Sequence, residues 1–276
     1  MSCHQVFQLL FYLKNLIKTL MKVMQSKLHI TILLLTILFP LSVFSAGDKV
    51  DLMEQKWPFN GIFGRFDNTA LQRGFKVYRE VCAACHGIRH VSYRDLKDIG
   101  FSSDEIKSIA GEYEITDGPN DEGEMFQREA LPSDKFVGPY ENDNVARVAN
   151  NGAYPPDLSL IVKARAGGAD YLYSLLNGYK EYPEDYEASE GMYYNTFYPG
   201  NQIAMPSPIE DDIVEYDDGT EATHTQIAKD VTAFLAWTAE PELEERKSLG
   251  VKTLFFLVLI TIMLLGVKRK IWKDLD

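Results

Sequence analysis

The sequence has little cysteine: only Cys3, Cys82 and Cys85 occur among its 276 residues. This scarcity excludes a disulfide framework of the kind that holds small secreted domains together. It also speaks against a structural zinc site, which usually takes a second cysteine or histidine pair at similar spacing. Two of the three cysteines belong to one short motif, Cys82-Ala83-Ala84-Cys85-His86.

Basic residues are scarce in the globular part of the chain. Between positions 47 and 250 there are 38 acidic against 19 basic residues, a net charge of -19, whereas the whole chain carries -12. This balance speaks against nucleic acid as a partner, because phosphate binding needs a cationic surface. It favours a basic protein partner attracted by charge, although acidity that only maintains solubility explains the composition equally well.

Long apolar runs occur only near the two ends of the chain. At the N-terminus, lysines precede an apolar run over 28–44 that ends in small residues. This order is typical of a secretory signal, so residues 1–46 are predicted to be a cleaved signal peptide. The length before Met21 leaves two alternatives open: a later start at Met21 or Met24, or a segment that stays as an anchor.

The C-terminal run covers 254–267, fourteen residues without a charge, and a basic cluster follows at 268–270. Counting from Leu249, with Lys252 snorkelling, brings it near the roughly 20 residues that a membrane span needs. We predict a transmembrane anchor over 248–270 and a cytoplasmic tail over 271–276, because basic clusters favour the cytoplasmic side. A buried helix of the domain is the alternative.

The Cys82–His86 motif has the spacing of a covalent c-type haem attachment site. Both thiols must reach the vinyl groups on one edge of a porphyrin, while His86 brings its imidazole to the iron. A thioredoxin-like redox pair normally opens a helix, whereas this motif closes a helical pattern. The sequence therefore predicts one covalent haem c on Cys82 and Cys85, with His86 as an iron ligand.

The second iron ligand must come from elsewhere, because His90 lies too near in sequence to reach the opposite porphyrin face. A methionine paired with histidine raises the reduction potential. Met205 stands in a proline-framed loop over 199–208 that suits a fixed ligand. Packing is the ordinary role of a methionine, so the residues alone leave four candidates open: Met125, Met192, Met205 and His224.

Helical periodicity is clearest before the haem motif and near the C-terminus. A helix is predicted over 69–85, capped by Asp67 or Asn68, with Gly74 marking a possible close approach of another backbone. A final helix of the domain is capped by Thr223 or Thr225. An acidic stretch over 112–139 shows no sustained period, and a hairpin is expected over 211–219. Shorter helical segments are expected over 91–96, 104–110, 145–149, 159–166 and 169–176.

Together these motifs resemble the cytochrome c1 family, the haem subunits of cytochrome bc1 complexes. The resemblance covers nearly the whole mature chain. It rests on several stretches in the family's order, which are 57–67, 71–74, 81–86, 151–159, 164–168, 201–205 and 236–242 followed by Arg246-Lys247. The chain lacks the extra cysteines that form a disulfide in some bacterial members.

The resemblance implies a fold and a set of roles. It implies an all-α, class I cytochrome c-like haem domain over 47–247, with long loop insertions and one C-terminal transmembrane helix. In that fold the helix before the haem motif crosses the last helix of the domain, pressing Gly74 and Phe75 or Tyr78 against Phe234 or Trp237. It implies Met205 as the second iron ligand, and Arg165 and Tyr171 as residues that approach a haem propionate.

The implied activity is electron transfer within quinol–cytochrome c reductase. The haem domain would take an electron from the Rieske iron–sulfur protein, beside cytochrome b, and pass it to a basic cytochrome c. It would lie on the periplasmic side of a bacterial inner membrane. The rival classes are an anchored cytochrome c that serves another complex, and a haem sensor or peroxidase with an open iron site.

Overall fold

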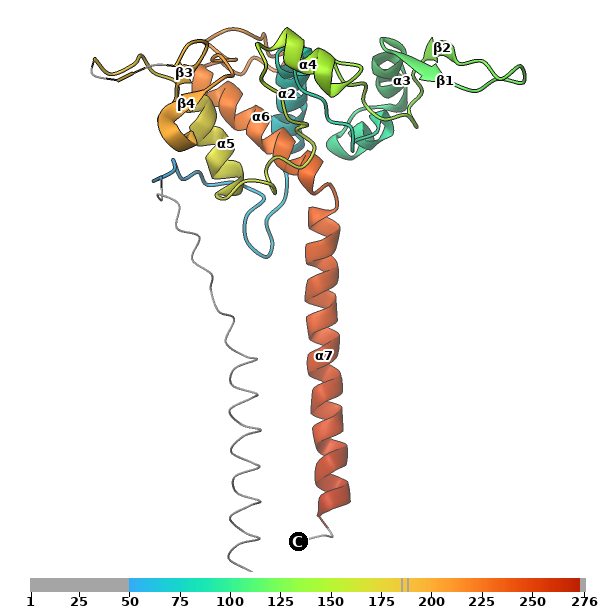
Figure 1. Ribbon diagram of the computed structural model, residues 1–276. Helices are drawn as coiled ribbons and strands as arrows, with labels where there is room; N and C mark the ends of the chain where they lie inside the picture. The colour runs from blue at the N-terminus through green and yellow to red at the C-terminus, as the bar shows by residue number, and fades with distance from the viewer. Residues whose placement is uncertain (1–49, 185, 188, 274–276) are drawn as a thin grey trace, which may run out of the picture. The chain divides into compact units, whose positions relative to one another are not determined.

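The computed structural model describes residues 50–184, 186–187 and 189–273 (Figure 1). The predicted signal segment lies outside these residues. The α-helices are α2 (Asn68–Glu80), α3 (Ser103–Gly111), α4 (Asp143–Ala149), α5 (Gly168–Asn177), α6 (His224–Ala239) and α7 (Leu243–Trp272). The 3₁₀ helices are η1 (Cys82–Ala84), η2 (Tyr93–Ile99) and η3 (Pro199–Asn201). Two short antiparallel pairs complete the described part: β1 (Glu114–Asp117) with β2 (Phe126–Glu129), and β3 (Tyr193–Tyr194) with β4 (Gln202–Ile203). The predicted all-α class is confirmed.

Helix α2 begins where the sequence predicts, because the Asp67 carboxylate accepts a hydrogen bond from the Thr69 amide at 3.0 Å. It ends earlier than predicted, at Glu80 rather than at Cys85. The chain then tightens into η1, where the amides of Cys85 and His86 both donate to the Cys82 carbonyl. The predicted helix over 69–85 is therefore wrong in its last turn, since this sharing of one carbonyl replaces α-helical pairing.

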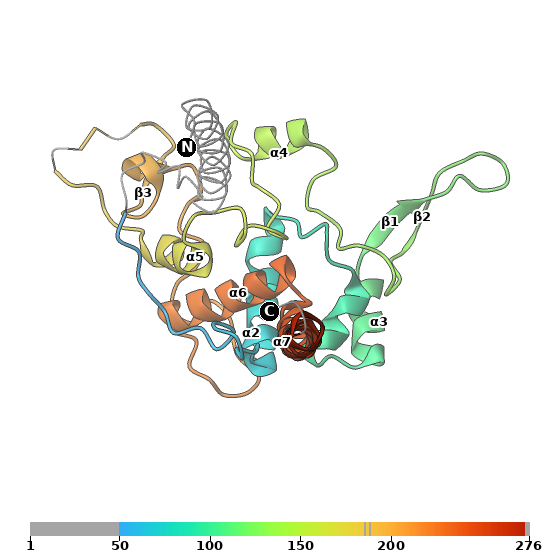
Figure 2. The same cartoon turned by 90° about the horizontal axis from the view of Figure 1, so that it is seen from below.

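Helices α2 and α6 cross, as Figures 1 and 2 show. The two helices approach most closely at Gly74. A Cβ atom at Gly74 would overlap the Asp230 carbonyl oxygen and lie 2.7 Å from the Phe234 Cβ. Beside it, the Phe75 and Phe234 rings lie 5.6 Å apart, and the Tyr78 and Phe234 rings 5.8 Å apart. The predicted crossing of the helix before the motif with the last helix of the domain is confirmed.

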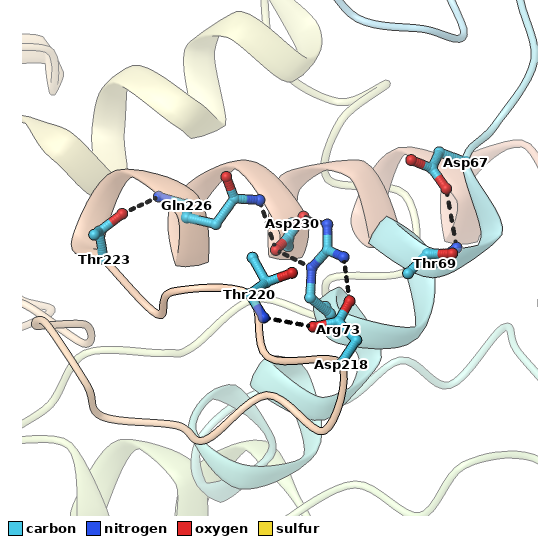
Figure 3. A network of polar contacts seen from close by, with 8 residues as sticks. All are labelled: Asp67, Thr69, Arg73, Asp218, Thr220, Thr223, Gln226 and Asp230. Carbon is cyan, nitrogen blue, oxygen red and sulfur yellow. Dashed lines mark hydrogen bonds and ion pairs between the residues drawn. The ribbon is translucent and has the colours of Figure 1, made fainter.

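A buried ion pair fastens the same crossing (Figure 3). The Arg73 guanidinium donates two hydrogen bonds to Asp230, at 2.8 and 3.0 Å, and a third to Asp218 at 2.7 Å. Gln226 donates to Asp230 as well, at 2.9 Å. Asp230 is 1% exposed, so its charge is tolerable only because these donors surround it.

Two predicted elements are absent from the described residues. The stretch 159–166 forms turns rather than a helix, because it runs into Gly167 and Gly168, whose φ angles are +88° and +56°. The hairpin expected over 211–219 is also wrong. That segment turns without pairing, since Val214 and Tyr216 are buried in the core while acids beside them bind α2 cations.

A hairpin occurs instead within the acidic stretch, formed by β1 and β2 (Figure 2). Glu114 pairs with Glu129 at one end, and Asp117 with Phe126 at the other. Arg128 forms ion pairs with Asp117 and Asp134 that fasten it. Neither face of the hairpin is buried, so its sequence lacks the alternation that reveals a half-buried strand.

Helix α7 is the one helix among the described residues that is long and apolar enough to cross a membrane. The side chains of its apolar stretch are exposed, with Leu254 at 65% and Met263 at 68%. The alternative of a buried helix within the domain is therefore wrong. The start of α7 is tied to residues 50–67, which we call the N-terminal arm, because Lys247 donates to the carbonyls of Phe59 and Gly64.

Candidate functional site

The turn η1 gathers the motif's three reactive side chains at the end of α2. Cys82 and Cys85 are half-buried free thiols, and His86 follows directly. Burial raises the pKa of the Cys82 thiol to about 12. Both a redox pair and a zinc site depend on thiolates, and burial disfavours the thiolate form of Cys82. The described residues also contain no group of three His, Cys, Asp or Glu side chains able to hold a metal ion.

The His86 imidazole is held in one orientation and one tautomer. Its Nδ1 lies 2.7 Å from the Pro156 carbonyl oxygen, which only accepts hydrogen bonds, so Nδ1 carries the proton. Burial lowers the pKa of His86, which favours the neutral ring. The Nε2 lone pair is then available to a metal, in the arrangement that histidine ligands commonly adopt.

The loop 151–159 positions that carbonyl through a row of hydrogen bonds to the residues just after His86. Leu158 N donates to Gly87 O at 2.8 Å, and Arg89 N donates to the Asp157 carboxylate at 2.9 Å. His90 N donates to the Ser159 hydroxyl at 3.0 Å. We call these three hydrogen bonds, between 157–159 and 87–90, the His86 support. It makes the proline-containing loop a part of the site.

Sequence reasoning missed the roles of Pro156 and Asp157. The two adjacent prolines identified the stretch as non-helical, and it contributed to the family resemblance. Its contact with His86 spans 70 positions of sequence, so no local pattern reveals it. The one available signal is an Asp-Leu-Ser sequence after two prolines, in which Asp157 Oδ1 accepts from Ser159 N at 2.9 Å.

A tyrosine fixes the backbone of His86 from the other direction. The Tyr78 hydroxyl, on α2, donates to the His86 carbonyl at 3.1 Å. Burial raises the pKa of Tyr78, so the hydroxyl remains a donor through the physiological range. The α2–α6 crossing buries the ring of Tyr78, and it thereby helps to position η1 and His86.

Among the candidates for the second ligand, Met205 is the one that packs against the core. It is half-buried and contacts the same hydrophobic cluster as Cys82 and Ala83. The other candidates differ: Met125 is 60% exposed and Met192 38% exposed, and the His224 ring already contacts the Leu176 carbonyl at 3.0 Å.

The loop that carries Met205 is held by tertiary contacts. The pairing of β3 with β4 places Tyr193 opposite Ile203, two residues before Met205. The Tyr179 hydroxyl donates to the Met205 carbonyl at 3.1 Å. The residue thus has a fixed backbone and a thioether packed against apolar neighbours, which is compatible with a soft iron ligand.

Arg165 and Tyr171 lie within electrostatic reach of one another. Tyr171 is buried on α5, and burial raises its pKa while the Arg165 guanidinium lowers it. Arg165 itself is exposed and donates to the Ala164 carbonyl at 3.2 Å. A free guanidinium edge beside a tyrosine hydroxyl offers donors to a carboxylate.

Comparison with known proteins decides the family. The model of the Cytochrome C1 family matches residues 57–275, most of the chain. The chain belongs to the cytochrome c1 family. A cytochrome c1 of Rhodospirillum rubrum is 49% identical over 241 residues, covering 82% of this chain and 89% of that protein. The mitochondrial cytochrome c1 1 heme protein of Arabidopsis thaliana is 47% identical over 234 residues, covering 85% and 76% respectively.

A third relative carries a name that refers to an assembly. The mitochondrial cytochrome b-c1 complex catalytic subunit of Candida albicans is 50% identical over 217 residues, covering 78% of this chain and 75% of that protein. Haem c is characteristic of the cytochrome c1 family. The donor set here fits that cofactor, since it combines two free thiols at the attachment spacing with a neutral imidazole whose Nε2 is unengaged.

Proposed function

We propose that this chain takes electrons from a Rieske iron–sulfur protein and passes them to cytochrome c, as a subunit of a quinol–cytochrome c reductase that also contains cytochrome b. The family membership and the name of the Candida albicans relative support a role in a cytochrome b-c1 complex. The observation that carries the proposal is the His86 imidazole, oriented by Pro156 beside two free thiols.

The proposed site has six residues. Cys82 and Cys85 form the thioether bonds, and His86 and Met205 ligate the iron. Arg165 and Tyr171 donate to a haem propionate. Support comes from the fixed His86 tautomer and from the packing of Met205 against the core that Cys82 also contacts.

The haem, when bound, supplies one-electron redox chemistry. The chain's own residues hold that chemistry in place and break no substrate bond. The Pro156 carbonyl accepts a hydrogen bond from His86 Nδ1 and keeps the imidazole oriented, while burial favours its neutral form. Met205 presents an uncharged thioether, which favours a fairly high reduction potential. These residues therefore contribute the geometry of the iron ligands and the reduction potential of the haem.

The acidic surface supports a basic cytochrome c as the acceptor. The 38 acidic residues between positions 47 and 250 outnumber basic residues two to one. The negative potential of such a surface raises the association rate with a basic partner, and salt screens this attraction. Electron transfer to a basic cytochrome c should slow as ionic strength rises. Rates that do not depend on salt would contradict this electrostatic attraction between the two proteins.

The proposed organisation has a cleaved signal over 1–46, a haem domain over 47–247, an anchor over 248–270 and a tail over 271–276. The basic cluster at 268–270 favours a cytoplasmic C-terminus, which places the haem domain in the periplasm of a bacterial inner membrane. Protease added to intact spheroplasts should digest the haem domain and leave a C-terminal tag. Digestion of the tag would reverse the topology.

A pyridine haemochrome spectrum tests the attachment. The purified chain should show a c-type spectrum, and the Cys82→Ser/Cys85→Ser double variant should lose all haem that survives acid-acetone extraction. Persistence of covalent haem in the double variant would refute attachment at these thiols. Co-purification with cytochrome b and a Rieske protein separates the proposed role from that of an anchored carrier for another complex.

A further inference from the structure

A cavity within the described residues lies away from the Cys82–His86 motif, none of whose residues lines it. It measures about 400 Å³, within the range of small-molecule sites. It is lined by the N-terminal arm, the turn before α5, the end of α6 and the first turns of α7. None of the six proposed haem-site residues lines it. Trp57, Phe59, Ala239 and Leu243 provide apolar walls.

Charges of both signs line the same cavity. Lys163 and Lys247 supply two cations, and Asp170 and Glu240 two carboxylates. Lys163 lies 3.4 Å from one oxygen of the Glu240 carboxylate, and Arg246, outside the cavity lining, pairs with the other oxygen. The Lys247 ammonium donates only to the carbonyls of Phe59 and Gly64, and it has no carboxylate partner among the described ion pairs. A cation without a counter-ion thus remains in a domain that is otherwise strongly acidic.

The length of α7 indicates at which depth of a membrane the cavity lies. Its 30 residues span about 45 Å, which matches a bilayer measured across both headgroup layers. With the apolar run in the hydrocarbon, the first turns at Leu243 and Lys247 lie at the headgroup level on the domain side. Trp57 suits that level, because its ring is apolar and its Nε1 donates, here to Asp170 at 2.7 Å.

We propose that this cavity binds the headgroup of a zwitterionic, amine-bearing phospholipid from the leaflet that faces the haem domain. The phosphate lies near Lys247 and Lys163, and the ammonium turns toward Glu240. The apolar walls at Phe59 and Leu243 cover the glycerol end. The equal numbers of cations and carboxylates favour this headgroup over an anionic one. The proposal rests on α7 crossing the membrane and is independent of the electron-transfer role.

Photo-crosslinking in vesicles tests the proposal with the full haem-loaded chain. The chain is reconstituted in phosphatidylethanolamine and phosphatidylglycerol, with a trace of phosphatidylethanolamine that carries a photoreactive headgroup. Adducts should map to peptides containing 57–61 and 163–170. Lys163→Gln should lower them about tenfold, as expected for one lost charge-assisted hydrogen bond. Ala239→Leu, which narrows the cavity without changing its charge, should lower them as well.

Lys180→Gln is the matched control, because Lys180 is exposed, lies outside the cavity and loses the same charge. Its adducts and the haem spectrum of every variant should be unchanged. Adducts confined to 248–272, or equal in all variants, would overturn the proposal. Equal competition by phosphatidylglycerol or by soluble phosphoethanolamine would also overturn it. Crosslinks from Lys163 to another subunit that fills the cavity in the intact complex would do the same.

Discussion

The two segments that carry the proposed iron ligands are built differently. Each has a tyrosine hydroxyl that donates to the backbone carbonyl of the ligand residue: Tyr78 to His86 and Tyr179 to Met205, both at 3.1 Å. Only His86 is also fixed by a hydrogen bond from its side chain, because its Nδ1 donates to the Pro156 carbonyl. A thioether has no proton to donate, so packing alone orients the Met205 side chain. The methionine side is therefore the more easily displaced.

Replacing Met205 by leucine should give the largest functional change. Leucine keeps the packing and removes the sulfur, so the iron should become open and bind carbon monoxide. The reduction potential should fall by on the order of a hundred millivolts, well within the range that axial ligands control. Redox titration and the reduced spectrum with carbon monoxide measure this. Met192→Leu is the matched control, and an unchanged Met205→Leu protein would transfer the ligand role to Met125, Met192 or His224.

The support of the histidine side depends on the α2–α6 crossing, which Gly74→Ala should break. The new Cβ would overlap the Asp230 backbone and force the helices apart, costing about 3 kcal/mol of the free energy of unfolding. Chemical denaturation followed by circular dichroism measures the change. Gly250→Ala is the control, because nothing lies within 4 Å of that position on α7. Equal stability of the two variants would show that the helices can move apart at Gly74 without a loss of stability.

Asp157→Ala tests the His86 support itself. The variant removes the acceptor of two amide protons, those of Arg89 and Ser159, and should cost about 1–2 kcal/mol. The reduction potential should shift as well, because the Pro156 carbonyl loses its fixed distance from His86. Asp157→Asn keeps one acceptor oxygen and should recover part of both changes. A stability loss without any shift in potential would limit Asp157 to a structural role.

The two tyrosines provide the finest test of the comparison. Tyr78→Phe and Tyr179→Phe each remove one hydroxyl that bonds a ligand's carbonyl, with an expected cost of about 1 kcal/mol. Tyr179→Phe should loosen the methionine side and raise the rate at which carbon monoxide enters the reduced protein. Tyr78→Phe should leave that rate near wild type, because Pro156 still holds the imidazole. Equal rates in the two variants would contradict the asymmetry.

Local sequence signals predicted the parts of the fold that depend on near neighbours. The cap at Asp67 and the cap at Thr223 are confirmed, since a side chain two or three residues from an orphan amide is visible in sequence. The β1–β2 hairpin escaped prediction because neither of its faces is buried. The hairpin predicted over 211–219 does not form. The apolar residues of this segment are buried individually in the core instead of alternating along a strand, and its acidic residues bind cations on α2.

The site divides in the same way. The Cys82–His86 spacing predicts haem attachment by itself, because both thiols must reach one porphyrin edge while the imidazole reaches the iron. The choice among the methionines needed family resemblance, and the structure adds burial and packing at Met205. The exposed Met125 and the engaged His224 ring are visible only in three dimensions.

The sequence by itself determined the cofactor chemistry and the apolar helix at the C-terminus, since each depends on residue identity and spacing along the chain. The crossing at Gly74 followed from the family resemblance. Only the tertiary structure decided how His86 is held. The Pro156 carbonyl lies 70 residues away in sequence and 2.7 Å away in space. Hydrogen bonds act over a few ångströms regardless of chain separation, so such a partner becomes visible only when the chain has folded.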